Sequence, residues 1–227
     1  MFDLLIKFPT RSRPDKFRNQ FDRYYNMLSG KRKVKFVVSM DEDDATMNNY
    51  DMQWWLSPGN GGRQNIFYYY GHSKTKIQAI NADMKDHQDF KVLLLASDDM
   101  TPIKQGYDDI ICSDMEKYFP DKMGALHYDD GRVGRDLNTL VVMNKSLYDY
   151  FGYIYHPSYV SVWCDNEFHE ATYNMGCAVF VPRVIIKHDW VNYTGKDSLH
   201  CRNESFYPVD EATFRRRRNI RFNPTAP

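Results

Sequence analysis

Short apolar runs alternate with polar or amphipathic stretches through the first hundred residues of the chain. Four of these runs predict buried strands, because each is short, apolar and bounded by polar or turn-forming residues, at 2–8, 34–40, 66–70 and 91–96. Apolar residues recur at helical spacing over 15–28, where Asp15 is a candidate N-cap, and a second helix is predicted over 76–84. Continuous apolar strands that alternate with helices favour a parallel sheet covered on both faces, so the predicted fold class is α/β.

The second half of the chain has a less regular pattern. Strands are predicted at 124–128 and 139–143, with Asp129-Asp130-Gly131 as the hairpin turn between them. Helices are predicted at 145–151 and 166–173, and a last strand at 178–187 is interrupted by Pro182. The sequence shows no internal repeat and no sign of a second domain. Its 227 residues are therefore expected to form a single domain.

The charge balance and the lengths of the apolar runs exclude several classes of protein. Thirty lysines and arginines balance thirty aspartates and glutamates, so no overall basic field attracts nucleic acid or an anionic membrane. No run approaches the ~20 apolar residues that a spanning helix needs, and the first residues lack the pattern of a signal peptide. The four cysteines show neither zinc spacing nor a Cys-x-x-Cys pair, so reduced thiols are expected. We therefore expect a cytoplasmic protein without a transmembrane segment.

Polar loops follow the predicted strands of the first half, at 10–14, 41–44, 71–76 and 97–99. Ligands of parallel sheets bind beyond the carboxyl ends of the strands, so these loops predict a site. Asp98 and Asp99 stand directly after a continuous apolar strand, where a divalent cation would relieve both their burial and their mutual repulsion. The alternative is a solvated aspartate pair that caps the next helix, since Thr101-Pro102 follows.

Three features of the second half are further candidates, each with a simpler structural alternative. His188 ends the last predicted strand and could complete a Mn²⁺ site begun by a distant aspartate, or be an ordinary surface or core histidine. Asp165 could be a general base in a cleft or the N-cap of the predicted helix. The run Arg215–Arg218 could bind an anionic acceptor, or be a solvated face or tail.

In this order, the loops resemble those of the GT-A glycosyltransferases, especially the family-2-like inverting enzymes, over residues 4–190. The loop Thr10-Arg11-Ser12-Arg13-Pro14 is similar to the opening nucleotide-binding loop of that fold. Asp41 stands where those enzymes place an acidic residue against the nucleobase. Residues 71–76, which end at Lys76, resemble the glycine-then-helix segment that closes on the donor.

The metal-binding motifs of that family have counterparts too. Residues 93–99 resemble the strand that ends in the DxD motif, although Ser97-Asp98-Asp99 departs from the Asp-x-Asp pattern. The metal role then falls to Asp99, with Asp98 directed toward the ribose or the metal. His188 resembles the metal-binding histidine that follows the last strand in some members.

The catalytic base of the inverting enzymes comes from an ED-type motif, which Asp165 and Glu167 resemble. Cys164 stands in place of the first acid of that motif, so the match is incomplete. The resemblance nevertheless implies that Asp165 is the base.

The resemblance implies one Rossmann-like GT-A domain over 1–205, with a mainly parallel central sheet flanked by helices. Its nucleotide-sugar half would cover about 1–100 and its acceptor half about 101–205, and a basic tail would follow at 206–227. The implied activity is the transfer of a sugar from a UDP- or GDP-linked donor to an acceptor hydroxyl, with inversion. Mn²⁺ or Mg²⁺ would bind Asp99 and His188. The residues assigned to the donor are Thr10, Arg11, Arg13, Asp41, Lys76 and Asp98.

Two parts of this interpretation stay open. The acceptor could be a glycan, a lipid, a protein or a nucleic acid. A nucleotidyltransferase would also use paired aspartates and Mg²⁺ on an α/β sheet, although the loop 10–14 lacks the glycine that such an enzyme needs. A module that binds nucleotide sugars without turnover is the other alternative.

Overall fold

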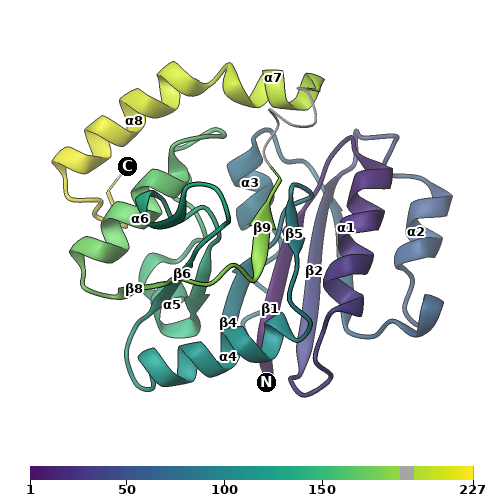
Figure 1. The fold of residues 1–227 in the computed structure, drawn as a ribbon. Coiled ribbons are helices and arrows are strands. Elements are labelled where there is room, and N and C mark those ends of the chain that lie inside the picture. The colour runs from purple at the N-terminus through teal and green to yellow at the C-terminus, as the bar shows by residue number, and fades with distance from the viewer. Residues whose placement is uncertain (190–196, 227) are drawn as a thin grey trace.

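The computed structural model describes residues 1–189 and 197–226; Trp190, where the GT-A-like stretch ends, lies outside them. A central sheet with helices packed around it forms the body of the molecule (Figure 1). Within the described residues this sheet has seven strands in the order β3-β2-β1-β4-β7-β6-β8, and β7 runs antiparallel to its neighbours. A second sheet pairs β5 with β9. The predicted α/β class with a mainly parallel sheet is confirmed.

The strands are β1 Phe2–Pro9, β2 Val34–Asp41, β3 Ile66–Gly71, β4 Phe90–Leu95, β5 Met100–Pro102, β6 Ala125–Tyr128, β7 Val142–Asn144, β8 Ala178–Val181 and β9 Ile186–His188. The helices are α1 Pro14–Asn26, α2 Tyr50–Leu56, α3 Lys76–Asn81, α4 Tyr107–Tyr118, α5 Lys145–Phe151, α6 Cys164–Asn174, α7 Ser198–Glu204 and α8 Tyr207–Asn219. Short 3-10 turns lie at η1 Asn60–Gly62 and η2 Gly134–Asp136. None of the helices in the described part of the chain combines the length and the apolar character that crossing a membrane requires.

The first half follows the predicted pattern closely. Strands β1, β2 and β3 each extend one residue beyond the predicted end, and β4 is shifted by one residue. Helix α1 begins at Pro14 with Arg13 at the N-cap position, so the prediction that Asp15 caps it is wrong. Asp15 lies in the first turn instead, where a carboxylate interacts favourably with the helix dipole.

Alternate residues of β1 enter two hydrophobic clusters, one on each face of the sheet. Leu4, Ile6 and Phe8 belong to the cluster beneath α1, α2 and α4, whereas Leu5 belongs to the cluster beneath α3, α5 and α6. The Phe8 ring meets the edge of Phe17 from α1 at a centroid distance of 5.1 Å, a favoured aromatic geometry. Since both faces are covered, the central strands read as continuous apolar runs.

Lys7 breaks this apolar pattern, because its amine-bearing side chain is fully buried on the α3 side of the sheet. Its Nζ donates hydrogen bonds to the hydroxyl of Ser39 and, at 2.8 Å, to the carbonyl of Ala82. The Ser39 hydroxyl in turn donates to the carboxylate of Asp83. Burial lowers the pKa of Lys7 to about 7, although the Asp83 carboxylate acts in the opposite direction.

This buried lysine should make the stability of the fold depend on pH. In the unfolded chain a lysine stays protonated up to about pH 10.4. Above about pH 7 the unfolded state therefore binds more protons than the folded state, and the free energy of unfolding rises with pH. We expect a rise of up to about 1.4 kcal/mol per pH unit between about pH 7 and 9 in urea unfolding. Lys7→Met should remove that rise; an equal slope in both proteins would show that folded Lys7 is charged.

The last predicted strand consists of two strands in different sheets. β8 pairs with β6 in the main sheet, and after Pro182 the chain leaves it to form β9, which pairs antiparallel with β5. Proline lacks the N–H that would continue the first ladder. The β5–β9 register sets Met100 opposite His188, and the N–H of Asp189 donates to the carbonyl of Asp99 at 2.8 Å. His188 is thereby brought beside the end of β4.

Residues 129–131 are not a hairpin turn, so this part of the prediction is wrong. β6 and β7 are antiparallel neighbours, but a long loop that contains η2 joins them. Asp130 organises this loop: its side chain is 1% exposed and accepts the N–H groups of Arg132 and Val133 at 2.9 and 2.8 Å. The hydroxyl of Thr139 donates to its other oxygen at 2.8 Å. The carboxylate is thus part of the interior.

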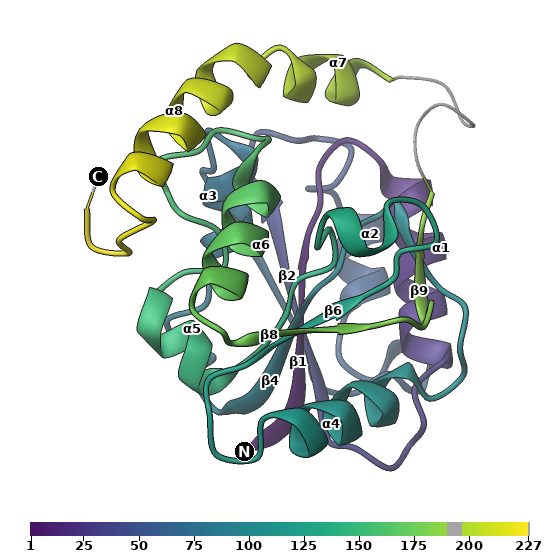
Figure 2. The ribbon, with the colours of Figure 1, turned by 60° about the vertical axis from the view of Figure 1, so that its left-hand side comes forward.

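Helix α8 lies entirely within the predicted basic tail, 206–227, and makes up most of it. Figures 1 and 2 both show α7 and α8 crossing the end of the molecule that lies opposite the N-terminus, where the parallel strands finish. Arg217 of α8 is fully buried and donates to both carboxylate oxygens of Glu167 in α6, at 2.7 and 2.9 Å. Arg215, Arg216 and Arg218 are exposed. The arginine run is therefore not a uniform solvated face, because one member binds a buried acid.

Candidate functional site

The loops after β1, β2 and β3 meet at the carboxyl edge of the sheet through Asp41, which is 5% exposed. One Arg11 nitrogen donates to Asp41 and to Asp43, at 2.7 Å in each case. The backbone N–H of Ser73 donates to the other Asp41 oxygen at 3.2 Å. Three segments assigned to donor binding are thus joined, and the Arg11 guanidinium is already shared between two carboxylates.

Thr10 stands in the same loop with an unsatisfied hydroxyl. Its N–H donates to the carbonyl of Ser39 at 3.0 Å, whereas its Oγ1 is buried without a hydrogen-bond partner among the described residues. A buried hydroxyl that lacks a partner costs free energy, so a ligand atom or a water molecule would be stabilised there.

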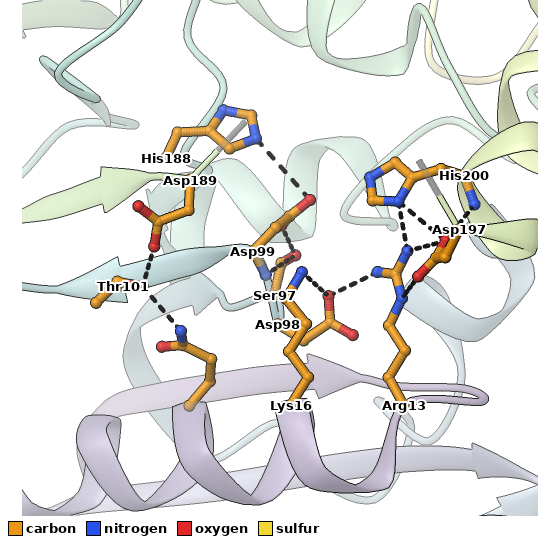
Figure 3. Close-up of polar contacts among 11 residues, drawn as sticks. Arg13, Lys16, Ser97, Asp98, Asp99, Thr101, His188, Asp189, Asp197 and His200 are labelled. Atoms are coloured by element: carbon orange, nitrogen blue, oxygen red, sulfur yellow. Dashed lines mark hydrogen bonds and ion pairs between the residues drawn. The ribbon is translucent and has the colours of Figure 1, made fainter. Parts of the chain in front are cut away.

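Asp98 is bound by cations from α1. Figure 3 shows Arg13 and Lys16 directed at its carboxylate, with nitrogen–oxygen distances of 2.9 and 3.8 Å. Burial raises the pKa of Asp98, although Arg13 acts against this. The other nitrogens of Arg13 donate to the two oxygens of Asp197 at 2.7 and 2.8 Å, and one lies 2.6 Å from Nδ1 of His200. Arg13 therefore connects the end of β4 to the start of α7.

Asp99 faces His188, as the resemblance implies. The distance between Asp99 Oδ2 and His188 Nε2 is 3.9 Å, and the side chains are 22% and 10% exposed (Figure 3). The Ser97 hydroxyl donates a hydrogen bond to the Asp99 carboxylate. Burial acts to raise the pKa of Asp99, but His188, the Ser97 hydroxyl and nearby lysines outweigh it, and the net pKa is lowered. The carboxylate stays ionised at neutral pH.

Asp130 lies on the other side of the His188 ring. The sequence predicts it only as a turn residue and gives no sign of a role at this site. Its Oδ2 is 3.4 Å from His188 Nδ1, and its carbonyl accepts the backbone N–H of His188 at 2.9 Å. Although burial acts to raise the pKa of Asp130, hydrogen bonds from His188 and the loop lower it. A carboxylate at Nδ1 orients the ring so that Nε2 can act as a metal ligand. No local pattern could have found it, because Asp-Asp-Gly suits an exposed turn equally well.

Asp99 and His188 fit a metal that is shared with a substrate. Carboxylate oxygen and imidazole nitrogen form a donor set compatible with Mn²⁺. Among residues 1–189 and 197–226, no group of three or more His, Cys, Asp or Glu side chains is arranged to hold a metal ion. Cations of this kind commonly use one or two protein carboxylates and complete their coordination with substrate phosphates. The pair therefore suits a diphosphate-bound cation better than a closed structural site.

Asp165 lies in the first turn of α6, where Trp163 occupies the N-cap position, so the N-cap interpretation is wrong. Burial raises the pKa of Asp165, and the charges of Lys76 and His188 oppose this rise. The same Lys76 and His188 lower the pKa of Asp99. Lys76 and His188 thus act electrostatically on both acids, Asp99 and Asp165.

Glu167 does not share this site. It is 5% exposed, and beyond its pairing with Arg217 it accepts the hydroxyl of Tyr159 at 2.9 Å. Its carboxylate is committed to the interior, so Asp165 is the acid of the ED-like stretch that remains a candidate base.

No model of a known protein family matches the chain, and no curated protein matches its sequence. Solved structures do match. A mannosyltransferase (PcManGT) from Pyrobaculum calidifontis, in complex with GDP-Man and Mn²⁺, is 12% identical with a TM-score of 0.61, over 83% of this chain and 57% of that one. TarS 1–349 from S. aureus, in complex with UDP-GlcNAc, is 11% identical with a TM-score of 0.61, over 82% and 58%.

A mutant β1,4-galactosyltransferase 7 from Drosophila, in complex with manganese, UDP-Gal and xylobiose, is 11% identical with a TM-score of 0.54. That match covers 87% of this chain and 75% of the galactosyltransferase. The chain thus spans little more than half the length of the first two structures. The shared arrangement of strands and helices shows that this protein has the fold of the GT-A-type glycosyltransferases.

Proposed function

We propose that the protein is a metal-dependent glycosyltransferase that moves a sugar, a hexose in our proposal, from a UDP- or GDP-linked donor to an acceptor hydroxyl. The observation that supports this most directly is the approach of Asp99 to His188 at the carboxyl edge of a GT-A sheet, with Asp165 within electrostatic reach of the same His188. The three structural neighbours contain GDP-Man, UDP-GlcNAc or UDP-Gal, and two of them contain manganese.

The donor would lie across the loops that end β1, β2 and β4. Asp41 would face the nucleobase, and the unpartnered hydroxyl of Thr10 would bind a donor oxygen. Arg13, which binds Asp98, would add positive charge on the side of the diphosphate. Lys76, exposed at the start of α3, would approach the diphosphate from the other side. A metal held by Asp99 and His188 would stabilise the charge that develops on the leaving diphosphate.

Asp165 is proposed as the general base. It takes the proton of the acceptor hydroxyl while the hydroxyl oxygen attacks the anomeric carbon from the face opposite the diphosphate. The new carbon–oxygen bond forms as the bond to the β-phosphate oxygen breaks, and its electron pair leaves with the nucleoside diphosphate. A single displacement inverts the anomeric configuration. The raised pKa of Asp165 supports this role, because a base is most effective when its pKa lies near the working pH.

Thermal unfolding with nucleotides tests the donor site. UDP, GDP and their sugar conjugates are compared with and without Mn²⁺, together with His188→Ala and the exposed-acid control Asp51→Asn on α2. A nucleotide at a hundred times its Kd should add about 2.7 kcal/mol of stability, or about 5–11 °C in Tm for a chain of this size. We expect a Tm shift with nucleotides of one nucleobase, and only when Mn²⁺ is present. His188→Ala should lose this shift, whereas Asp51→Asn should keep it.

Either of two results would count against the proposal. Absence of a shift with every nucleotide, metal present, would contradict the donor site. A clear shift without release of nucleoside diphosphate, across glycan, lipid, protein and nucleic-acid acceptors, would point to the binding module without turnover.

A further inference from the structure

Helix α8 has no role in the proposed reaction, yet it is fastened to the loop that leads into Asp165. Figure 2 shows α8 passing over the end of the molecule with α6 beneath it. The buried contacts of α8 with α6 and with the loop before it come from three successive turns, at Asp210, Phe214 and Arg217. All three side chains are buried, which is unusual for a segment so rich in charged residues.

Asp210 binds the backbone of the loop before α6. Its side chain is fully buried, and its carboxylate accepts the N–H groups of Val160, Ser161 and Val162 at 2.9, 2.8 and 2.9 Å. Three successive N–H groups that converge on one anion form a concave binding site for negative charge. Hydrogen bonds to a carboxylate are stronger than those between neutral groups, so this contact fixes the course of the loop.

The next residue toward Asp165 is also held by α8. Trp163 has a φ of 62°, in a region that residues with a side chain seldom adopt, so its surroundings must keep it there. The indole packs on Phe214, with ring centroids 5.2 Å apart, and on Tyr207 at 6.0 Å. On the far side of Asp165, Glu167 is bound by the buried guanidinium of Arg217.

We propose that α8 is a positioning element for the catalytic base, with Asp210 as its principal positioning residue. Asp165 lies between Trp163 and Glu167, and α8 holds both neighbours as well as the loop that precedes them. The helix would thereby keep the Asp165 carboxylate aimed at the acceptor hydroxyl. This role rests on the proposed function, because it requires Asp165 to act as the base.

Asp210→Asn tests the proposal, because it keeps the size of the side chain but removes the charge that gathers the three N–H groups. A misplacement of about 1 Å in a catalytic group can cost about 10²-fold in rate. We therefore expect kcat to fall about 10–100-fold, while the donor KM and the nucleotide-induced Tm shift change less than about twofold. Glu211→Gln is the matched control, since Glu211 neighbours Asp210 but binds the exposed Arg215; it should keep wild-type kcat.

Phe214→Leu gives a second, milder measurement should Asp210→Asn fail to fold. It weakens the contact with Trp163 and should lower kcat several-fold at unchanged donor KM. Wild-type kcat in a folded variant, or a parallel loss of kcat and donor binding, would show that α8 is merely structural. If the wild-type chain itself transfers no sugar, the proposed function fails first and the positioning role fails with it. An active wild type with an equally active Asp210→Asn overturns the positioning role alone.

Discussion

Replacing Asp99 with alanine should abolish sugar transfer and the effect of Mn²⁺ on donor binding. Asp99 is the acid that faces Nε2 of His188, and its pKa is lowered, so it supplies negative charge to a cation at neutral pH. Loss of one preorganised electrostatic contact to a transition state costs about 10²–10³-fold in rate. Because Asp99→Ala would also release the metal, we expect a loss of at least about 10³-fold in kcat/KM, measured as release of nucleoside diphosphate at saturating Mn²⁺.

Asp189→Asn is the matched control for this variant. Asp189 lies at the same edge, but its carboxylate turns to the Thr101 hydroxyl rather than to the site (Figure 3). An asparagine can keep that hydrogen bond, so the control should retain activity and metal dependence. Full transfer activity in Asp99→Ala at saturating metal would remove Asp99 from the metal site and, with it, the reason to expect a metal there.

Replacing Asp165 with asparagine should lower kcat by about 10²–10⁴-fold, the usual contribution of a positioned general base. The amide has nearly the same shape but cannot take a proton from the acceptor. Among the described residues, Asp165 makes no hydrogen bond to a residue proposed to bind the donor, so the nucleotide-induced Tm shift and its dependence on Mn²⁺ should remain. Glu170→Gln provides the control, because Glu170 lies on α6 as well but pairs with the exposed Arg218.

The pH dependence of kcat sharpens this second prediction. A base must be deprotonated to act, and burial raises the pKa of Asp165 above that of an ordinary aspartate. The rate should therefore fall as pH decreases through this raised pKa, at a higher pH than an exposed aspartate would give. The residual activity of Asp165→Asn should lack that acidic limb. Unchanged kcat and an unchanged pH profile would assign the base to another residue.

The parts of the fold that could be predicted are those governed by local periodicity. β1 to β4 and α1 are long or strongly apolar, and α5 was predicted at its observed bounds, 145–151. Asp98 and Asp99 could be placed at the sheet edge, because a loop after a parallel strand has only one end of the sheet on which to lie. The prediction of Asp99 and His188 as neighbours came from the family resemblance, and their side chains do face one another.

The parts that could not be predicted depend on partners far away in the chain. β5 and β9 are three residues each, and their pairing joins residues 88 apart in numbering, Met100 and His188. Asp130 looks like a turn residue until Thr139 and His188 are seen against it. Arg217 looks like one solvated arginine among four, because its acid, Glu167, belongs to another helix. Burial and pairing of these charges are tertiary properties, which local composition does not reveal.

The short β5–β9 ladder also ties the chemistry of the site to the length of a connection. His188 reaches Asp99 only because the link from Val181 to Ile186 delivers β9 in one register. A slip of one residue in a strand exchanges the side chains on its two faces. If one residue were removed from that link, the carboxylate of Asp189 would take the position of the His188 imidazole beside Asp99. Two carboxylates favour Mg²⁺, whereas a carboxylate with an imidazole favours Mn²⁺. If the proposed cation binds here, its preference could therefore change through insertions and deletions in this link, without any point substitution.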